Sequence, residues 1–420
     1  MLKQIEGSHA MAEAIALCRP EVICAYPITP QTHIVEGLGE LVKSGVLQDC
    51  EFINVESEFA ALSVAIGASA AGARAYTATA SQGLLFMAEA VYNAAGLGLP
   101  IVMTLGNRAI GAPINIWNDH SDAMSMRDAG WIQLFAETNQ EAVDLHILAF
   151  RLAEVLSMPV MVCVDGFILT HAVERVDIPD QAQVDAFLPP YDPVQVLDPE
   201  HPASIGAMVG PEAFTEVRFL AHYKQRQALR LIPAFSLDFA KIFGRAAGGL
   251  LRPYRIEDAE TIVVAMGSVC GTIKDVIDAM RDEGEKIGAV SLVSYRPFPV
   301  DELRQILAPA KDVVVVEKSI AVGVGGPLAD NIDGALRNLD RRPRLHSAIA
   351  GLGGRPISRA SLRNLFRMAV ESPWEGAHFL DLNEHVVGRE IHRVRKVRRS
   401  GSTAENILRQ LALASQLPPG

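Results

Sequence analysis

Short apolar segments alternate with helical segments through the first half of the chain, and this alternation restricts its fold more than any other feature. Four segments have the length and β-branched content of buried strands: "EVICAYP", "RAYTATA", "IVMTLGN" and "VMVCVDG". Between them, apolar residues recur at helical spacing near Glu58 to Ala71, Leu84 to Ala95 and Gln140 to Leu156. Strands that alternate with helices predict a parallel sheet with helices on both faces.

A second strand and helix series begins after residue 255, with "TIVVAMGS", "IGAVSLVS" and "DVVVVEK" as its strands and helices over 271–283 and 300–307. The 420 residues therefore predict an α/β protein with a first domain over 1–245, a smaller α/β domain over 255–375 and a C-terminal tail over 376–420. In the tail, the basic run "HRVRKVRR" suits a solvated helix face or a docking strip on an acidic partner, and the solvated face is favoured. The tail as a whole is predicted to dock on a partner subunit.

The segment 179–211 is rich in proline and shows neither helical nor strand periodicity. We expect it to run as an extended excursion over the surface of the first domain, followed by long helical stretches from Glu212 to Phe243.

Composition disfavours several classes of partner. The formal net charge is −11, whereas binding to phosphate backbones depends on Lys and Arg, so we expect no nucleic acid partner. The five cysteines form no CxxC or Cys/His pair at metal spacing, so this chain alone cannot build a zinc site or a cysteine-ligated iron–sulfur cluster. No apolar run reaches the roughly 20 residues of a membrane helix. These features predict a soluble, cytoplasmic protein with reduced thiols and no membrane partner.

Polar segments follow the predicted strands: "YPITP", "TASQG", "GNRAIGAPINIWNDHSD" and "VDGF". Ligands of parallel sheets bind beyond the carboxyl ends of the strands, so these segments predict one shared site. In "AYPITPQT", Thr29 is predicted to cap a helix whose first residue is Pro30. The segment is either an anion-binding helix start or only a well-capped turn.

Two charged residues stand out near these junctions. Glu58 opens a helix that carries almost no other large polar side chain, so it is either a simple helix-capping residue or a buried carboxylate that needs a partner, with Glu56 as the competing candidate. Arg108 follows an apolar strand and suits the bidentate binding of a substrate carboxylate.

Other polar and glycine-rich runs have simpler interpretations. "DHSD" has no further His or Cys close in sequence, so a hydrogen-bonded loop network is favoured over a metal site. "AVGVGGPL" and "AGLGGRPIS" lack the spacing of a dinucleotide fingerprint and predict tight turns and close packing.

Three long blocks occur in order: "AYPITPQT", "VESEFAALSVAIGASAAGARAYTATASQGL" and "GNRAIGAPINIWNDHSDAMSMRDAGWIQLFAE". They closely resemble the alpha subunits of pyruvate:ferredoxin oxidoreductases, within the thiamine-diphosphate-dependent 2-oxoacid:ferredoxin oxidoreductases. The resemblance continues in "MGSVCGT", "YRPFP", "GGPL" and "AGLGGR" and so covers most of the chain. It implies a pyrimidine-binding-type thiamine diphosphate domain, followed by a smaller domain like the C-terminal domain of transketolase.

The resemblance also implies roles for residues at the strand ends. Glu58 matches the glutamate that hydrogen-bonds the pyrimidine nitrogen of the cofactor, and Arg108 matches the arginine that receives the substrate carboxylate. Thr29 matches a threonine that contacts the substrate. The remaining cofactor contacts are assigned to Tyr26, Pro27, Ile28, Ser81 and Gln82.

Thiamine enzymes hold Mg²⁺ and the diphosphate on a GDG motif, and this chain has only "VDGF" on an unsuitable flank. The resemblance therefore implies a beta subunit that binds Mg²⁺ and the diphosphate, a ferredoxin-like subunit with the iron–sulfur clusters, and a gamma-type subunit. No metal is assigned to this chain. Coenzyme A is the implied co-substrate and an external ferredoxin the electron acceptor.

The implied reaction is the oxidative decarboxylation of pyruvate to acetyl-CoA and CO₂, with electrons passed to ferredoxin, by a subunit active only with its partners. Pyruvate is favoured because "NRAIGAPINIWNDHSD" looks like the pyruvate-type loop. Branched-chain 2-oxoacids and oxalate remain alternatives, although Thr29 in "YPITP" counts against oxalate. A non-catalytic assembly subunit is the alternative from a different functional class.

Overall fold

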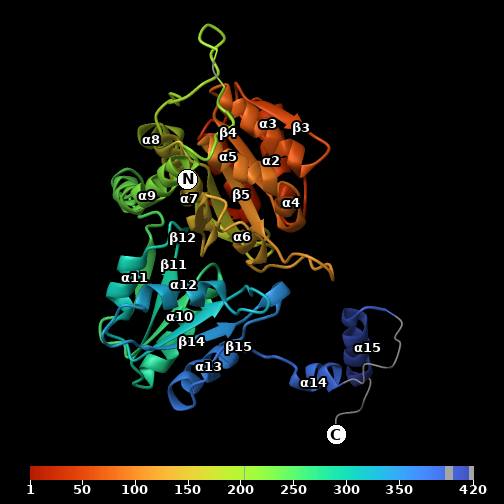
Figure 1. The fold of residues 1–420 in the computed structure, drawn as a ribbon, viewed down its shortest axis with the longest axis vertical. Helices are drawn as coiled ribbons and strands as arrows, with labels where there is room; N and C mark the ends of the chain where they lie inside the picture. Colours follow the sequence, from red (N-terminus) through yellow and green to blue (C-terminus); the bar gives the residue numbers. More distant parts are fainter. Residues whose placement is uncertain (203, 393–400, 416–420) are drawn as a thin grey trace.

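The computed structural model describes residues 1–202, 204–392 and 401–415. Seven described strands form the first sheet, in the order β12-β6-β7-β5-β4-β2-β3, and every neighbouring pair is parallel except β12 with β6 (Figure 1). The strands are β2 (Val22–Ala25), β3 (Glu51–Asn54), β4 (Ala75–Thr79), β5 (Ile101–Asn107), β6 (Ile132–Phe135), β7 (Val160–Asp165) and β12 (Ser294–Arg296). The four strands predicted in the first half, which are β2, β4, β5 and β7, are confirmed.

Helices cover both faces of this sheet because successive strand residues face two different cores. In β5, Val102 belongs to one core while Ile101 and Met103 belong to the other. One core includes residues of α1 (Gly7–Leu17), α2 (Thr32–Lys43) and α7 (Asn139–Leu156), and the other includes residues of α3 (Glu58–Ala70) and α5 (Ala88–Leu97). Strands buried on both faces are the pattern of a parallel sheet, so the predicted α/β class is confirmed.

Two predicted helix boundaries in this half are wrong. The helix expected over 84–95 is two helices, α4 (Ser81–Phe86) and α5, which meet at Met87. Thr29 caps no helix and Pro30 begins none, because α2 starts at Thr32 and Gln31 is its N-cap residue. The preceding residues form a turn instead, with a cis Thr29–Pro30 bond and a 2.9 Å hydrogen bond from the Gln31 amide to the Ile28 carbonyl.

The second sheet runs β15-β14-β13-β10-β11-β9, with only β9 antiparallel to its neighbour among the described strands. Its strands are β9 (Leu251–Tyr254), β10 (Thr261–Ala265), β11 (Ile287–Leu292), β13 (Asp312–Glu317), β14 (Arg344–Ile349) and β15 (Ala377–Phe379). Its helices are α10 (Val269–Asp282), α11 (Val300–Leu307), α12 (Pro327–Leu336) and α13 (Arg359–Glu371), with the 3₁₀ turn η1 (Leu352–Gly354). The sheet therefore begins before residue 255 and ends after residue 375.

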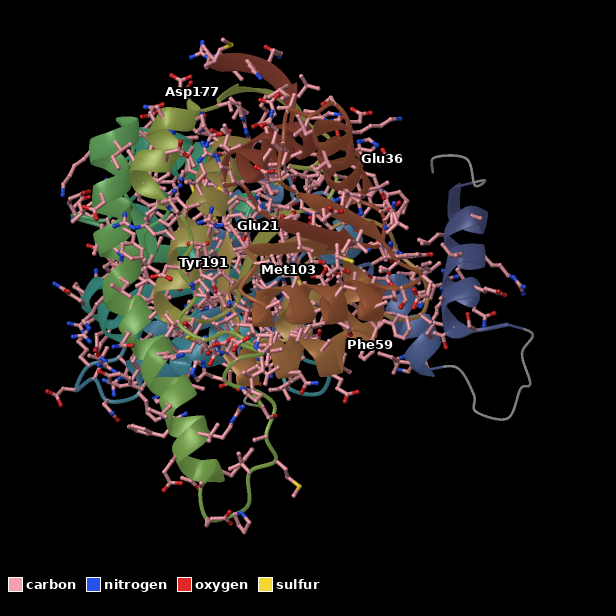
Figure 2. The ribbon with its side chains drawn as sticks, turned by 90° about the horizontal axis from the view of Figure 1, so that it is seen from above. Glu21, Glu36, Phe59, Met103, Asp177 and Tyr191 are labelled. Atoms are coloured by element: carbon pink, nitrogen blue, oxygen red, sulfur yellow. The ribbon has the colours of Figure 1, made fainter. Side chains whose placement is uncertain are left out.

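Between the two sheets the chain forms an arm. The first part of the 179–211 segment is helical, contrary to expectation: α8 (Gln181–Phe187) starts where the Gln183 side chain accepts a 3.1 Å hydrogen bond from the Asp180 amide. The rest of its described part has no regular secondary structure. It first runs along the body, where the Leu197 amide donates to the Ala70 carbonyl at 2.8 Å, and then forms a loop that projects from the body in both views (Figures 1 and 2). The single helix α9 (Phe214–Phe243) then confirms the predicted helical stretch.

The two chain ends lie outside the main sheets. The N-terminal β1 (Leu2–Glu6) pairs antiparallel with β8 (Val173–Asp177). The C-terminal α14 (Glu384–His392) and α15 (Thr403–Ser415) stand apart from the body (Figure 1). Most of the basic run "HRVRKVRR" lies outside the described residues. No helix in the described ranges combines the length and apolarity required to cross a bilayer.

A buried ion-pair network joins the carboxyl edges of the two sheets. Asp165 at the end of β7 is hydrogen-bonded to His120 at 2.7 Å and accepts a 2.7 Å bond from the Lys318 ammonium, which follows β13. The amide of Ser268, which follows β10, donates to the same carboxylate at 2.9 Å. Burial alone would raise the pKa of Asp165, but Lys318 and His120 hold this pKa well below its usual range.

We predict that Lys318→Met lowers the free energy of unfolding by roughly 3–5 kcal/mol, because it leaves the Asp165 carboxylate buried without its ammonium partner. Urea denaturation followed by tryptophan fluorescence measures the change. Lys311→Met is the matched control, because Lys311 pairs with Glu260 at the surface and such pairs contribute at most about 1 kcal/mol. If both variants lose the same free energy of unfolding, the ion pair between Lys318 and Asp165 does not stabilise the junction between the sheets as proposed.

Candidate active site

The ends of β2, β4, β5 and β7 converge as predicted. Gln31 connects two of them, because its side-chain amide donates to the Tyr26 carbonyl after β2 at 2.9 Å and to the Ala78 carbonyl in β4 at 3.4 Å. Pro30 fits closely against two glycines of the sheet: a Cβ added to Gly106 would lie 3.5 Å from its Cγ, and one added to Gly166 only 2.5 Å away. These glycines let the "YPITP" loop lie directly over the carboxyl ends of β5 and β7.

Asp122, at the start of α6 (Ser121–Ser125), fixes the backbone at two of these ends. Its fully buried carboxylate accepts the amide of Ser81 after β4 and the amide of Arg108 after β5, both at 3.0 Å. The Asn107 side chain donates to its other oxygen at 2.8 Å. Burial raises the pKa of Asp122 to about 6, and these hydrogen bonds oppose the shift. The predicted loop network around "DHSD" is confirmed, with Asp122 at its centre.

Arg108 lies under the "YPITP" loop and is only 6% exposed. Its Nη1 donates to the Thr29 carbonyl at 2.8 Å and its Nε donates to the Asn115 carbonyl at 3.1 Å. Burial lowers the pKa of Arg108, and the nearby Asp122 opposes the shift. Within the described residues, no carboxylate forms an ion pair with this guanidinium. The Arg108 guanidinium therefore has N–H donors that remain available to an anionic ligand. Thr29, beside it, is exposed.

Glu58 is the first residue of α3 and is 8% exposed, whereas Glu56 is exposed. The helix starts here because the Ser57 hydroxyl accepts a 3.2 Å hydrogen bond from the Ala60 amide. The Glu58 carboxylate accepts no hydrogen bond from any described residue. A Cβ on Gly83 in α4 would lie 2.8 Å from its Oε1, so only glycine leaves this carboxylate its space.

The other predicted site residues differ in accessibility. Tyr26 and Pro27 are exposed and Ile28 is half-buried, so the loop offers its side chains to a ligand. Gln82 is half-buried, and its amide donates to the Gly111 carbonyl at 3.2 Å. Ser81 is fully buried, with its hydroxyl in hydrogen-bond reach of the Ala109 carbonyl. Two residues of this site, Gln31 and Gly83, are not singled out by the sequence patterns, and Asp122 is predicted only as a member of the "DHSD" loop network.

The second sheet supports the loop that follows Arg108. Gly353 and Gly354 have positive φ angles of 58° and 78°, as the predicted tight turns require. A Cβ on Gly354 would lie 2.4 Å from the Cβ of Trp117, so the glycine permits close packing with the loop. The Gly353 amide donates to the Asp119 side chain at 3.0 Å, and the Gly354 amide donates to the Asn118 carbonyl at 2.8 Å.

The rim of the site is apolar. Ile114, Ile116 and Trp117 are exposed in the loop beyond Arg108, and Tyr26 is exposed on the loop after β2. Large apolar side chains at the mouth of a polar site mark a surface that another chain or a ligand covers.

No group of three or more His, Cys, Asp or Glu side chains suited to a metal occurs among the described residues. The two central residues of "VDGF" have other contacts. Asp165 forms the ion pair with Lys318, and Gly166 packs against Pro30.

Two family models match the chain. The model described as pyruvate flavodoxin/ferredoxin oxidoreductase, thiamine diphosphate-binding, matches residues 13–232. The model of pyruvate:ferredoxin oxidoreductase core domain II matches residues 259–362. Together they cover all strands of the first sheet and the central strands β10, β11, β13 and β14 of the second.

Curated relatives match over most of their length. Pyruvate synthase subunit PorA of Methanosarcina barkeri is 45% identical over 390 residues, which are 91% of this chain and 97% of the relative. Ketoisovalerate oxidoreductase subunit VorA of Pyrococcus horikoshii is 40% identical over 357 residues, which are 85% of this chain and 90% of the relative.

Two solved structures share the fold at low sequence identity. The 2-oxoglutarate:ferredoxin oxidoreductase of Magnetococcus marinus, with 2-oxoglutarate, coenzyme A and succinyl-CoA bound, aligns with a TM-score of 0.68 and 19% identity over 88% of this chain and 65% of that chain. A split-gene transketolase, described as an inactive beta4 tetramer, aligns with a TM-score of 0.53 and 12% identity over 88% of this chain and 99% of that chain.

These matches confirm the predicted fold class, a thiamine-diphosphate-binding parallel-sheet domain followed by a smaller transketolase-like α/β domain. The first family model covers more than half of the chain, and the two relatives are 45% and 40% identical over 97% and 90% of their own length. The chain therefore belongs to the pyruvate flavodoxin/ferredoxin oxidoreductase family.

Proposed function

We propose that this chain is the alpha subunit of a multi-subunit pyruvate:ferredoxin oxidoreductase. The complex would decarboxylate pyruvate oxidatively to acetyl-CoA and CO₂ and pass the electrons to ferredoxin. One observation carries the proposal: a buried Glu58 carboxylate without a described partner lies at the same sheet edge as a buried Arg108 without an ion pair. The 45% identity to a pyruvate synthase subunit supports the choice of reaction.

The residues at this edge fit thiamine diphosphate. When bound, the cofactor supplies a carbon nucleophile and an electron sink for the 2-oxoacid. Glu58 would hydrogen-bond the pyrimidine ring and so exchange a proton with it, because its carboxylate has no other described partner and Gly83 leaves it space. Tyr26, Pro27, Ile28 and Gln82 would contact the ring, while the buried Ser81 would act through its backbone, which Asp122 holds.

Arg108 and Thr29 would bind the substrate. The free donors of Arg108 suit a carboxylate, and Thr29 lies beside it with an exposed side chain. A branched-chain 2-oxoacid is the second candidate substrate, because a ketoisovalerate oxidoreductase subunit is 40% identical.

The rest of the complex is assigned to other chains. The "VDGF" residues are engaged elsewhere and no described cluster suits Mg²⁺, so a beta subunit would bind the metal and the diphosphate and cover the apolar rim. A ferredoxin-like subunit would hold the iron–sulfur clusters, and a gamma-type subunit would complete the complex. Coenzyme A is the proposed co-substrate. Five free cysteines suit the reducing environment of the cytoplasm.

We also propose the division of the chain into a first domain over 1–245 and a smaller α/β domain, whose sheet extends beyond the predicted 255–375 range to include β9 and β15. The part of the predicted 376–420 tail that follows β15 would dock on a partner subunit. The separation of α14 and α15 from the body supports this role for the tail (Figure 1).

We predict that Glu58→Gln lowers kcat of the assembled complex by about 10²-fold or more, because the amide cannot exchange a proton with the cofactor. Pyruvate-dependent ferredoxin reduction measures the rate. Glu56→Gln removes a neighbouring exposed carboxylate and should retain the wild-type rate. A Glu58→Gln complex that matches the Glu56→Gln control would support the non-catalytic assembly alternative.

Arg108→Met should raise KM for pyruvate by about 10²-fold, because the variant lacks the charge-assisted hydrogen bonds to the substrate carboxylate. Steady-state kinetics measure KM, and cofactor binding should be retained. Arg19→Met is the control, because Arg19 pairs with Asp185 away from the site. An unchanged KM, or loss of the cofactor without a change in KM, would exclude the carboxylate role.

The chain purified alone should be inactive and should bind thiamine diphosphate poorly, because the metal and diphosphate half of the site would belong to the beta subunit. Calorimetric titration of the cofactor with Mg²⁺, before and after addition of that subunit, measures the difference. Robust turnover by the single chain would contradict the two-chain site.

A further inference from the structure

A cavity with charged side chains in its lining lies at the opposite edge of the first sheet from the candidate active site. It has a volume of about 420 Å³ and is bounded by α9, the 127–131 segment before β6 and the 296–298 segment at the end of β12. Trp131 precedes the first residue of β6, and Arg296 pairs with Gln133 near the start of that strand. The cavity therefore lies at the amino edge of the strands, whereas the Glu58 and Arg108 site lies at their carboxyl edge.

The cavity is strongly cationic in an acidic chain. Its lining includes four arginines and one histidine but a single carboxylate, Asp128, although the chain as a whole has a net charge of −11. The four arginines come from three separate segments: Arg218 and Arg226 from α9, Arg127 from the turn before β6, and Arg296 from β12. Like charges gathered from separate segments repel one another, so an anion that enters the cavity would relieve this repulsion.

Two of these arginines are held in place by the protein. The Nε of Arg296 donates to the Arg127 carbonyl at 3.1 Å, and Arg127 donates to the Met124 carbonyl at 2.9 Å. Asp128 is the only described carboxylate near them, at 3.7 Å from Arg127 and 3.6 Å from Arg296. These two side chains form a fixed cationic wall.

The two α9 arginines have no partner among the described residues. Arg218 and Arg226 form neither a hydrogen bond nor an ion pair there, and both are exposed. They are eight residues apart, or about 12 Å along the helix, with His222 between them on the same face. Gln225 anchors this part of α9 to the opposite wall, because its amide donates to the Gly130 carbonyl at 2.9 Å. The unpaired guanidinium groups are therefore available to a ligand.

The charge does not continue along the helix. The adjoining groove beyond Arg226 is lined by Arg230 but also by Asp301 and Glu302, so the positive charge is confined to the first cavity. Phe298 and Leu229 lie where the two spaces meet and give an apolar wall. A concave cationic space of limited length suits a compact anion with an apolar part better than an extended acidic polypeptide.

We propose that this cavity is a binding site for a small phosphate-bearing anion, either pyrophosphate or the phosphates of a nucleotide. Arg218 and Arg226 would bind the phosphate oxygens from the α9 side. Arg127 and Arg296, which already have partners in the protein, would add positive charge on the other wall. In a nucleotide, the base would lie toward Phe298 and Leu229. The inference does not depend on the function proposed for the other edge of the sheet.

The test is calorimetric titration of the full chain with pyrophosphate, ADP and adenosine, with Trp131 fluorescence as a second readout because this residue lines the cavity. We expect saturable binding of pyrophosphate or ADP, no binding of adenosine, and weaker binding as salt is raised. The double variant Arg218→Ala/Arg226→Ala should lose at least about tenfold in affinity. Arg230→Ala is the matched control, because Arg230 is an exposed arginine of the same helix outside the cavity.

Each outcome distinguishes the alternatives. Equal affinities for pyrophosphate and ADP identify the phosphates as the recognised group, and tighter binding of ADP identifies a nucleotide. The proposal is overturned if no phosphate compound binds, if the double variant binds as the wild type does, or if Arg230→Ala loses as much affinity. Tighter binding of a polyglutamate peptide than of pyrophosphate would also overturn it and would indicate an acidic protein partner instead.

Discussion

The buried carboxylate of Asp122 organises the strand ends on which the candidate active site depends. It accepts the amides of Ser81 and Arg108 at 3.0 Å each, and so connects the segments that follow β4 and β5. Burial makes this arrangement costly, which the raised pKa of about 6 expresses. The cost is offset because donors from the two segments obtain a common acceptor, which fixes the position of the backbone that carries Arg108.

A second buried carboxylate extends this order to the other half of the molecule. Asp165 accepts a hydrogen bond from Lys318 and is hydrogen-bonded to His120, which lies two residues before Asp122. Gly353 and Gly354 of the second domain pack closely against Asn115 and Trp117, in the loop between Arg108 and His120. The second domain therefore holds this loop in position. The two sheets meet at the carboxyl edge of the first sheet, where the candidate active site lies.

The sequence predicts the parts of the structure that follow from local periodicity. The strands β5 and β13 and the helix α11 agree closely with their predicted ranges, because strand and helix spacing are visible in the apolar residues. The start of α3 at Glu58 is also predicted, and in the structure the Ser57 side chain caps it. The start of α2 is not, because a turn through Thr29–Pro30 replaces the expected cap with a tertiary arrangement around Gln31.

The sequence predicts where the site lies and which charged residues face it, but it does not predict the buried residues that hold them in place. Convergence of strand ends follows from a parallel sheet, so Arg108 and Thr29 were expected near each other. The buried positions of Gln31 and Gly83 depend on which strands are neighbours, and no pattern in the chain reveals that order. The antiparallel β12 begins 129 residues after the end of β7, at Ser294 against Asp165, and still joins the first sheet. This is a long-range contact without a local signal.

The central claim is that Glu58 exchanges a proton with bound thiamine diphosphate. Exchange of the thiazolium carbon proton for deuterium, followed by quenched-flow NMR in the assembled complex without substrate, tests it most directly. We expect Glu58→Gln to slow this exchange by about 10²-fold or more and Glu56→Gln to leave it unchanged. Equal exchange rates in the wild type and in Glu58→Gln, with the cofactor bound in both, would contradict the account.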